Sequence, residues 1–516
     1  MSLYKLRDLI RKIKVLSPRA SLIASAAAYM IIKPVGYLRL LLIAYLFGAS
    51  AGIDAYYIAS GAVSLIMGIA ASVIHTSVMP NLMRLSAKDE AAARSYFAVV
   101  IRYVLVWGVI AVFVIMLFPA GCVWLFASAL DSERAEIAKN MLLLLLPMGY
   151  TQLLSALLNV WANYKKIYSL INIINALATP AGLLILLILF PFMGVYAVAL
   201  SLLIVAVVFT LISLYLLRDI PIVPSTSIPE NILKKTAKDA FMCIWVLGAG
   251  IFYTVIDCWF AAGLEEGNVS AISYASQIIT QIMIIAILAS QIHLTHLSRI
   301  FEDEALLSES LNKSLAIGWA YMLPIACASA ALSFPIIKVI LGYGAFDYRA
   351  ISLTAPCFAI LAVGTPFLAW IIIMNNWGVA TSRLKLLFTV SCVSICLNVF
   401  LDWLFAPIWG AAGICAATSL IQVALGIYYV YRMAPGGTFK RQAPSAMKQV
   451  IFSSVWASAL FYISDHTFAS IISGVAAVFF HLYVCEYFGW LGPVPELWRP
   501  RALLGMVYRV FIMKKL

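Results

Sequence analysis

The feature that most constrains this chain is a run of about 20 apolar residues that recurs from one end to the other. A helix needs ~20 mainly apolar residues to cross the hydrocarbon core of a bilayer. The runs account for a composition that is 64% hydrophobic and only 11% charged over 516 residues. No polar stretch between them is long enough to form a separate soluble domain. The sequence therefore predicts an all-α polytopic membrane protein.

Fourteen helices are predicted from the apolar runs and from the polar, Gly or Pro breaks that separate them. We expect them near residues 20–47, 54–80, 97–128, 140–163, 168–190, 194–217, 240–263, 268–291, 314–341, 352–376, 385–407, 410–432, 449–464 and 467–488.

The distribution of basic residues predicts the orientation of these helices. Most of the 35 Lys and Arg lie in the two ends of the chain and in every second loop, whereas the opposite loops hold only Arg134, Lys139 and Arg349. Basic loops remain in the cytoplasm. Both termini are therefore expected in the cytoplasm, with an even number of spans. The same pattern explains the net charge of +13 without a nucleic-acid partner.

The longest polar connection divides the chain into two groups of six helices, followed by a final pair. Paired bundles with a site between them are common in alternating-access carriers. The predicted parts are a basic amphipathic segment at 1–19, a first bundle at 20–217, a cytoplasmic linker at 218–239, a second bundle at 240–432, helices 13–14 at 449–488 and a basic cytoplasmic tail at 489–516.

Two cations lie inside the first predicted helix. Lys33 and Arg39 flank Pro34 and Gly36, and a break there would let the helix bend and line a cavity. Charges at membrane depth usually face a cavity or a partner. We predict that the pair binds an anionic substrate such as a pyrophosphate. The alternative is an internal pairing, for example with Asp54.

A second polar group is predicted close to the outer ends of three helices. Asp257 lies near the end of its helix, Asn398 and Asp402 share one helix face, and Thr418 lies about eight residues into the next helix. At ~1.5 Å per residue these side chains reach a similar depth. Hard oxygen ligands suit a small cation, so we predict a site for such an ion. A protonated carboxylate pair and a structural polar network are the alternatives.

Three segments carry a resemblance to a known family. They are GYLRLLLIAYLFGASAGIDAYYIA (36–59), IDCWFAAGLEEGNVSAISYA (256–275) and LGYGAFDYRAISL (341–353). Together they resemble the MurJ/MviN lipid II flippases of the multidrug/oligosaccharidyl-lipid/polysaccharide exporter superfamily. The resemblance implies two six-helix bundles around a cationic cavity, with helices 13–14 forming a groove for a lipid tail.

The resemblance also assigns roles residue by residue. Arg39 and Asp54 match the family's Arg and Asp, while Lys33 stands in place of an Arg. The four residues Asp257, Asn398, Asp402 and Thr418 fall on the family's sodium-site positions. Two departures are Met67 and Gln277, which replace arginines, so Gln277 takes a substrate-binding position without a charge.

The sequence thus predicts a flippase rather than an enzyme. Its expected substrate is a polyprenyl-pyrophosphate-linked glycan such as lipid II, carried across the bacterial inner membrane by alternating access and coupled to sodium. Membrane lipids are the other expected partners, the only expected cofactor is the sodium ion, and the protein is expected to be monomeric. The alternatives are a cation-coupled multidrug exporter, a flippase for an exopolysaccharide or O-antigen unit, a membrane glycosyltransferase and a non-transporting scaffold.

Overall fold

A computed structural model of the protein describes residues 18–167, 169–226, 230–284, 304–381, 383–434, 437–462, 467–495 and 499–500. Every regular element in these ranges is a helix. Eleven of the helices are long and apolar enough to cross a membrane. The basic end segments predicted at 1–19 and 489–516 lie largely outside the described residues.

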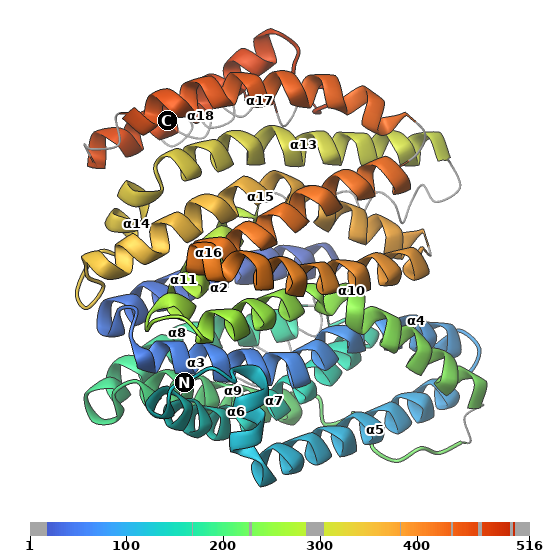
Figure 1. Ribbon diagram of the computed structural model, residues 1–516. Helices are drawn as coiled ribbons and strands as arrows, with labels where there is room; N and C mark the ends of the chain where they lie inside the picture. Colours follow the sequence, from blue (N-terminus) through green and yellow to red (C-terminus); the bar gives the residue numbers. More distant parts are fainter. Residues whose placement is uncertain are drawn as a thin grey trace, which may run out of the picture. The chain divides into compact units, whose positions relative to one another are not determined.

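The chain divides into two compact units, Met1–Val269 and Ser270–Leu516. The helices of the first unit (Figure 1) are α2 (Pro18–Phe47), α3 (Ala51–Val63), the π-helical turn η1 (Ser64–Gly68), α4 (Ile69–Ser86), α5 (Glu90–Leu117), α6 (Pro119–Phe126), α7 (Ser132–Tyr164), α8 (Leu170–Met193), α9 (Tyr196–Leu216) and α10 (Glu230–Ala262). The helix α10 packs against α3 and α4. The division therefore falls after α10, whereas the sequence suggested a boundary in the linker at 218–239.

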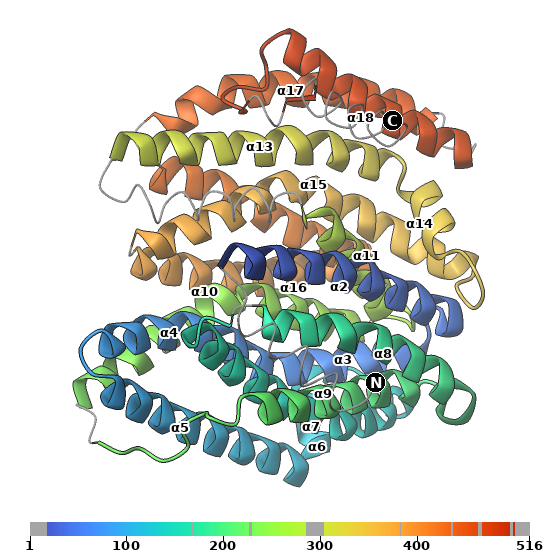
Figure 2. The same ribbon diagram turned by 180° about the vertical axis from the view of Figure 1, so that it is seen from behind.

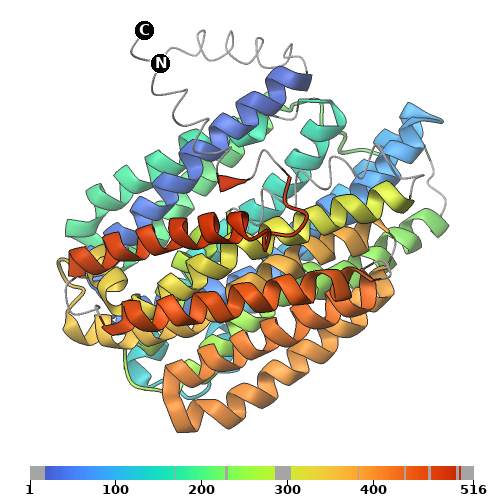
Figure 3. The same cartoon turned by 90° about the horizontal axis from the view of Figure 1, so that it is seen from above.

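The second unit starts within α11 and ends in the C-terminal helix pair. Its helices are α11 (Asn268–Ile282), α13 (Glu304–Ala331), α14 (Ser333–Leu341), α15 (Tyr348–Ala380), α16 (Leu384–Met433), α17 (Thr438–Tyr462) and α18 (Thr467–Tyr487). The helix α13 packs against α15, α17 and α18, and α15 packs against α16. Figure 3 shows α16 as two arms that meet at a sharp bend.

The bend in α16 accounts for two of the predicted helices, 385–407 and 410–432. Gly410 has φ 57° and ψ −135°, a conformation that side-chain-bearing residues rarely adopt. A straight helix of 50 residues would be ~75 Å long, far more than a ~30 Å hydrocarbon core requires. The chain therefore turns back at Gly410 after Pro407.

Other predicted helices are longer, shorter or divided. The run at 97–128 divides into α5 and α6 because Pro119 starts a new helix after Phe118. The run at 314–341 divides at Leu332 into α13 and α14. The run at 268–291 is helical to Ile282, and its last residues lie outside the described ranges.

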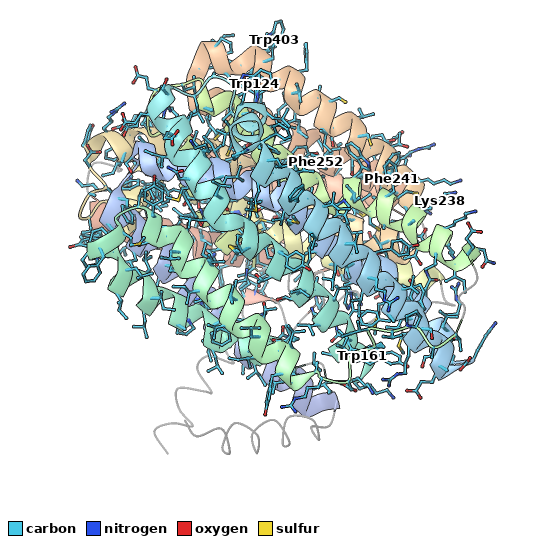
Figure 4. All side chains as sticks on the ribbon, turned by 90° about the horizontal axis from the view of Figure 1, so that it is seen from below. Trp124, Trp161, Lys238, Phe241, Phe252 and Trp403 are labelled. Atoms are coloured by element: carbon cyan, nitrogen blue, oxygen red, sulfur yellow. The ribbon has the colours of Figure 1, made fainter. Side chains whose placement is uncertain are left out.

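The core of the first unit is aromatic near the end of α7. Trp161 is fully buried and stacks on Phe97 of α5, with ring centroids 5.2 Å apart. The ring of Trp161 also stacks on that of Tyr164, with centroids 5.1 Å apart. Figure 4 shows Trp161 and Trp124 toward opposite ends of this unit. Close packing of this kind fixes the positions of α5 and α7 relative to each other.

Candidate substrate and cation sites

The predicted cations Lys33 and Arg39 are both half-buried on α2. Arg39 Nη2 donates to the carbonyl oxygen of Val198 at 2.9 Å and to the hydroxyl of Ser201 at 3.2 Å, both on α9. A Cβ atom on Gly182 of α8 would lie 3.4 Å from Arg39 Nη1. A glycine at this position thus leaves room for the guanidinium, which is held beside α8 and α9.

The helix α2 continues through Pro34 and Gly36 from Pro18 to Phe47. The predicted break at these residues is therefore wrong, since no interruption separates Lys33 from Arg39. Figure 2 shows α2 running beside α8, and the two helices pack against each other. This packing supports α2 through the turn where Pro34 supplies no N–H donor.

Asp54 is fully buried in the first turn of α3. Its Oδ2 accepts a hydrogen bond of 2.7 Å from the backbone N–H of Gly267 and lies 3.7 Å from Arg134 Nη1. The structure thus pairs Asp54 with Arg134 of α7.

Arg134 is the residue of this site that the sequence analysis missed. Its Nε donates to Asp131 Oδ2 at 2.9 Å, and its Nη2 donates to the carbonyl oxygen of Leu264 at 3.3 Å. The pKa of the Asp131 carboxyl is lowered, because the backbone N–H of Arg134 and then its guanidinium bind the ionised form. The only signal in the sequence is that Arg134 is a rare cation in an otherwise weakly basic set of loops.

The turn between α10 and α11 is joined to α3 by two reciprocal hydrogen bonds. Glu266 Oε1 accepts from the backbone N–H of Ala51 at 2.8 Å, while Asp54 accepts from Gly267. Each segment therefore supplies a carboxylate to the backbone of the other. Glu266 also places a negative charge at the N-terminus of α3, where the helix dipole favours it.

The two departures from the family pattern differ in their surroundings. Met67 is fully buried in η1, and a Cβ atom on Gly149 of α7 would lie 3.0 Å from its Cγ. Gln277 is half-buried on α11. Met67 is thus part of the apolar packing between η1 and α7.

Three of the four predicted cation ligands lie on α16. Asn398 and Asp402 are fully buried one turn apart, and Thr418 is also buried. Gly410 lies midway between Asp402 and Thr418, so the two arms bring these residues to matching positions along the hairpin. A Cβ atom on Gly413 would overlap the carbonyl oxygen of Phe405, which shows how closely the arms approach.

The fourth predicted ligand, Asp257, is buried in α10 of the first unit. Among the described residues, no three His, Cys, Asp or Glu side chains come together as a metal-binding group. A cation bound at the three α16 residues would therefore depend on amide, hydroxyl or backbone oxygens as well as the Asp402 carboxylate. Sodium accepts such a ligand set because it is a hard ion that prefers neutral and anionic oxygens.

The many apolar spans and the buried charges within them define a polytopic membrane protein. The fold is similar to that of an inward-facing multidrug resistance MATE family transporter of the MOP superfamily. That match has a TM-score of 0.63 and 14% identity, and covers 85% of this chain and 98% of the other.

The chain belongs to the MurJ family, because the family model "Lipid II flippase MurJ" matches residues 43–491. A probable lipid II flippase MurJ of Thermotoga maritima is 25% identical over 413 residues, which are 78% of this chain and 82% of the relative. One from Synechocystis is 29% identical over 129 residues, 24% of either chain. A solved lipid II flippase MurJ in an inward closed conformation matches with a TM-score of 0.74 and 19% identity over 90% of this chain and 99% of that one.

Family and fold together identify a flippase for a lipid-linked precursor. The protein is a multi-pass protein of the inner membrane.

Proposed function

We propose that this protein moves lipid II, the lipid-linked precursor of peptidoglycan, from the cytoplasmic to the outer leaflet by alternating access. The observation that carries the proposal is the family match over residues 43–491. It spans both compact units and includes α18 of the C-terminal pair. The predicted fourteen spans and cytoplasmic termini are part of this proposal.

The cations of α2 are proposed to bind the pyrophosphate of the substrate. A guanidinium presents several N–H donors in a fixed plane, which suits phosphate oxygens. The bonds from Arg39 Nη2 to Val198 and Ser201 orient that plane against α9. Lys33 would add a second positive charge from the same helix. Asp54 would act on them indirectly, by fixing the start of α3.

Sodium coupling is proposed to act through α16 and α10. A cation bound at Asn398, Asp402 and Thr418, with Asp257 as a further ligand, would stabilise the conformation in which those oxygens converge. The cation can drive transport only if it binds two conformations of the protein with different affinities. The placement of Asn398 and Asp402 supports the proposal, since both are buried one turn apart and carry the oxygen atoms that a small cation prefers.

A different lipid-linked glycan is the second candidate substrate. Met67 and Gln277 replace two arginines of the family pattern, and Met67 is buried in apolar packing. Fewer cations would weaken the binding of the pyrophosphate or of acidic groups on the glycan. This candidate keeps the flippase mechanism and changes only the sugar unit.

Complementation of a strain depleted of its lipid II flippase tests the substrate. Growth is expected with the wild-type chain and is expected to be lost with Arg39→Ala. The exposed Arg84 at the end of α4 offers a control, and Arg84→Ala should still support growth. If the wild-type chain is inserted at normal levels and does not restore growth, lipid II is not its substrate.

A further inference from the structure

A deep apolar groove lies among α4, α5 and α10, away from the cations of α2. Its volume is about 710 Å³, within the ~300–1,000 Å³ range of small-molecule sites. Small side chains make room for it, namely Ala70 and Ser77 on α4 and Ala237 and Ala240 on α10.

The hydroxyls on the α4 and α10 walls of the groove are already used within the protein. The hydroxyl of Ser77 donates to the carbonyl oxygen of Val73, and that of Thr236 donates to the carbonyl oxygen of Ile232. Thr236 also accepts a 2.9 Å hydrogen bond from Asn81 Nδ2. The α5 wall adds Tyr103 and Trp107, whose rings are largely apolar. A glycan or a pyrophosphate would lose most of its hydration here without compensation, whereas the lining fits a hydrocarbon chain.

One end of the groove is charged and its rim is aromatic. Glu230 and Lys234 lie at this end, in the first turns of α10, and form an exposed ion pair of 3.0 Å. Lys238 follows one turn later (Figure 4) and adds a positive charge. The rim residues Tyr103 and Phe241 are 69% and 56% exposed.

The length of the groove matches one leaflet of the membrane. The apolar lining of α10 runs from Leu233 to Ile244, which at ~1.5 Å per residue is about 16 Å. Each leaflet contributes about half of a ~30 Å hydrocarbon core. An acyl chain whose headgroup lies beside Lys234 would therefore end near Ile244.

We propose that the groove among α4, α5 and α10 is a binding site for an anionic phospholipid of the cytoplasmic leaflet. One acyl chain fills the groove, and the phosphate lies beside Lys234 and Lys238. The leaflet follows from Lys234, Lys235 and Lys238 in the first turns of α10, because basic residues at the ends of membrane spans remain on the cytoplasmic side. The site is separate from the proposed substrate site and does not depend on which glycan is carried.

Native mass spectrometry of the purified chain from nanodiscs tests the proposal. Val104→Trp fills the groove from α5, whereas Val109→Trp adds the same ring to an exposed position of that helix outside the groove. The first variant is expected to retain about tenfold less phospholipid than the wild type, and the second to match it. A thermal unfolding midpoint close to that of the wild type shows that Val104→Trp is folded. Should it not fold, Ala240→Leu replaces it.

The headgroup is tested with nanodiscs of phosphatidylglycerol and of phosphatidylcholine. Lys234→Gln is expected to lower the preference for phosphatidylglycerol about fivefold, the effect of one lysine near an anionic surface. Lys385→Gln, at an exposed position of α16, should leave the preference for phosphatidylglycerol unchanged. Equal phospholipid retention by both tryptophan variants would overturn the proposal. So would recovery of a polyprenyl lipid instead of a phospholipid.

Discussion

The Asp54 carboxylate accepts a 2.7 Å hydrogen bond from the backbone N–H of Gly267, a residue 213 positions further along the chain. The neighbouring residue Glu266 returns the contact by accepting from Ala51. Arg134 lies 3.7 Å from the same Asp54 oxygen and donates to Leu264 in the same turn. The start of α3, the start of α7 and the turn after α10 are thus held together by buried charges.

Removal of Arg134 is expected to destabilise the protein strongly. Arg134→Leu removes the cation that lies 3.7 Å from the fully buried Asp54 carboxylate, and breaking a buried pair typically costs about 3–5 kcal/mol. The measurement is the thermal unfolding midpoint in detergent. Asp54→Asn in the same chain should recover part of the loss, because the uncompensated charge is then absent.

Lys139 provides the matched control on the same helix. It pairs with Glu136 at 2.8 Å, but its side chain is 30% exposed and that of Glu136 is 62% exposed. Exposed pairs contribute about 0–1 kcal/mol, so Lys139→Leu should hardly change the midpoint. Equal midpoints for Arg134→Leu and Lys139→Leu would show that the buried pair contributes no more than a surface one.

Asp219, in the connection after α9, predicts a dependence of stability on pH. Burial acts to raise the pKa of its carboxyl, but the hydrogen bond and charge of Lys165, 3.0 Å away, outweigh burial and lower it below 3.8. A lowered pKa in the folded state stabilises the protein above the unfolded-state pKa, and this stabilisation is lost as pH falls through the folded-state pKa. The difference in unfolding midpoint between wild type and Asp219→Asn should be constant near pH 7 and should shrink below about pH 4.

The magnitude of that difference is expected to be small, because Asp219 is half exposed. Lys165→Met alone should lower the unfolding midpoint at neutral pH by a similar amount. The double variant Lys165→Met/Asp219→Asn should have nearly the same midpoint as Lys165→Met. A difference that grows as pH falls below 4 would contradict the sign of the shift.

Sodium is expected to raise the unfolding midpoint through Asp402. A ligand that binds only the folded state stabilises it by about 2.7 kcal/mol at a concentration of 100 times its Kd. Asp402→Asn should abolish the increase caused by sodium chloride relative to choline chloride. Asp347→Asn is the control, because Asp347 is exposed and caps α15 by accepting from the N–H of Ala350. An unchanged response to sodium in Asp402→Asn would remove this residue from the proposed site.

The helical class and most spans could be predicted from the sequence, because the bilayer requires long apolar runs with internal hydrogen bonds. The division at Pro119 and the return at Gly410 also have local signals, since proline starts helices and glycine permits positive φ. The packing of helices that are distant in the sequence could not be predicted from such local signals. The helix α10 belongs to the first unit because it packs against α3 and α4, which are distant in the sequence. Nothing in the composition of the 218–239 linker indicates these contacts.

The polar residues show the same contrast. Asn398 and Asp402 were predicted to share a face because a spacing of four residues determines it, and both are buried on α16. The partner of Asp54 was not predicted. Arg134 belongs to a predicted loop that served only as evidence for orientation, whereas the structure places it in the first turn of α7, and it reaches Asp54 because α3 packs against α7.

The α16 hairpin depends on two glycines. Gly410→Ala forces a side-chain-bearing residue to adopt φ near 57°, at a cost of about 1–3 kcal/mol. Gly413→Ala places a methyl group against the carbonyl oxygen of Phe405 and should separate the two arms. Gly36→Ala is the control, because no atom lies within 4 Å of a Cβ there. Both α16 variants should lower the unfolding midpoint and weaken the response to sodium, because Asp402 and Thr418 lie on opposite arms. A normal response to sodium in both, at a lowered midpoint, would show that Thr418 takes no part in binding the ion.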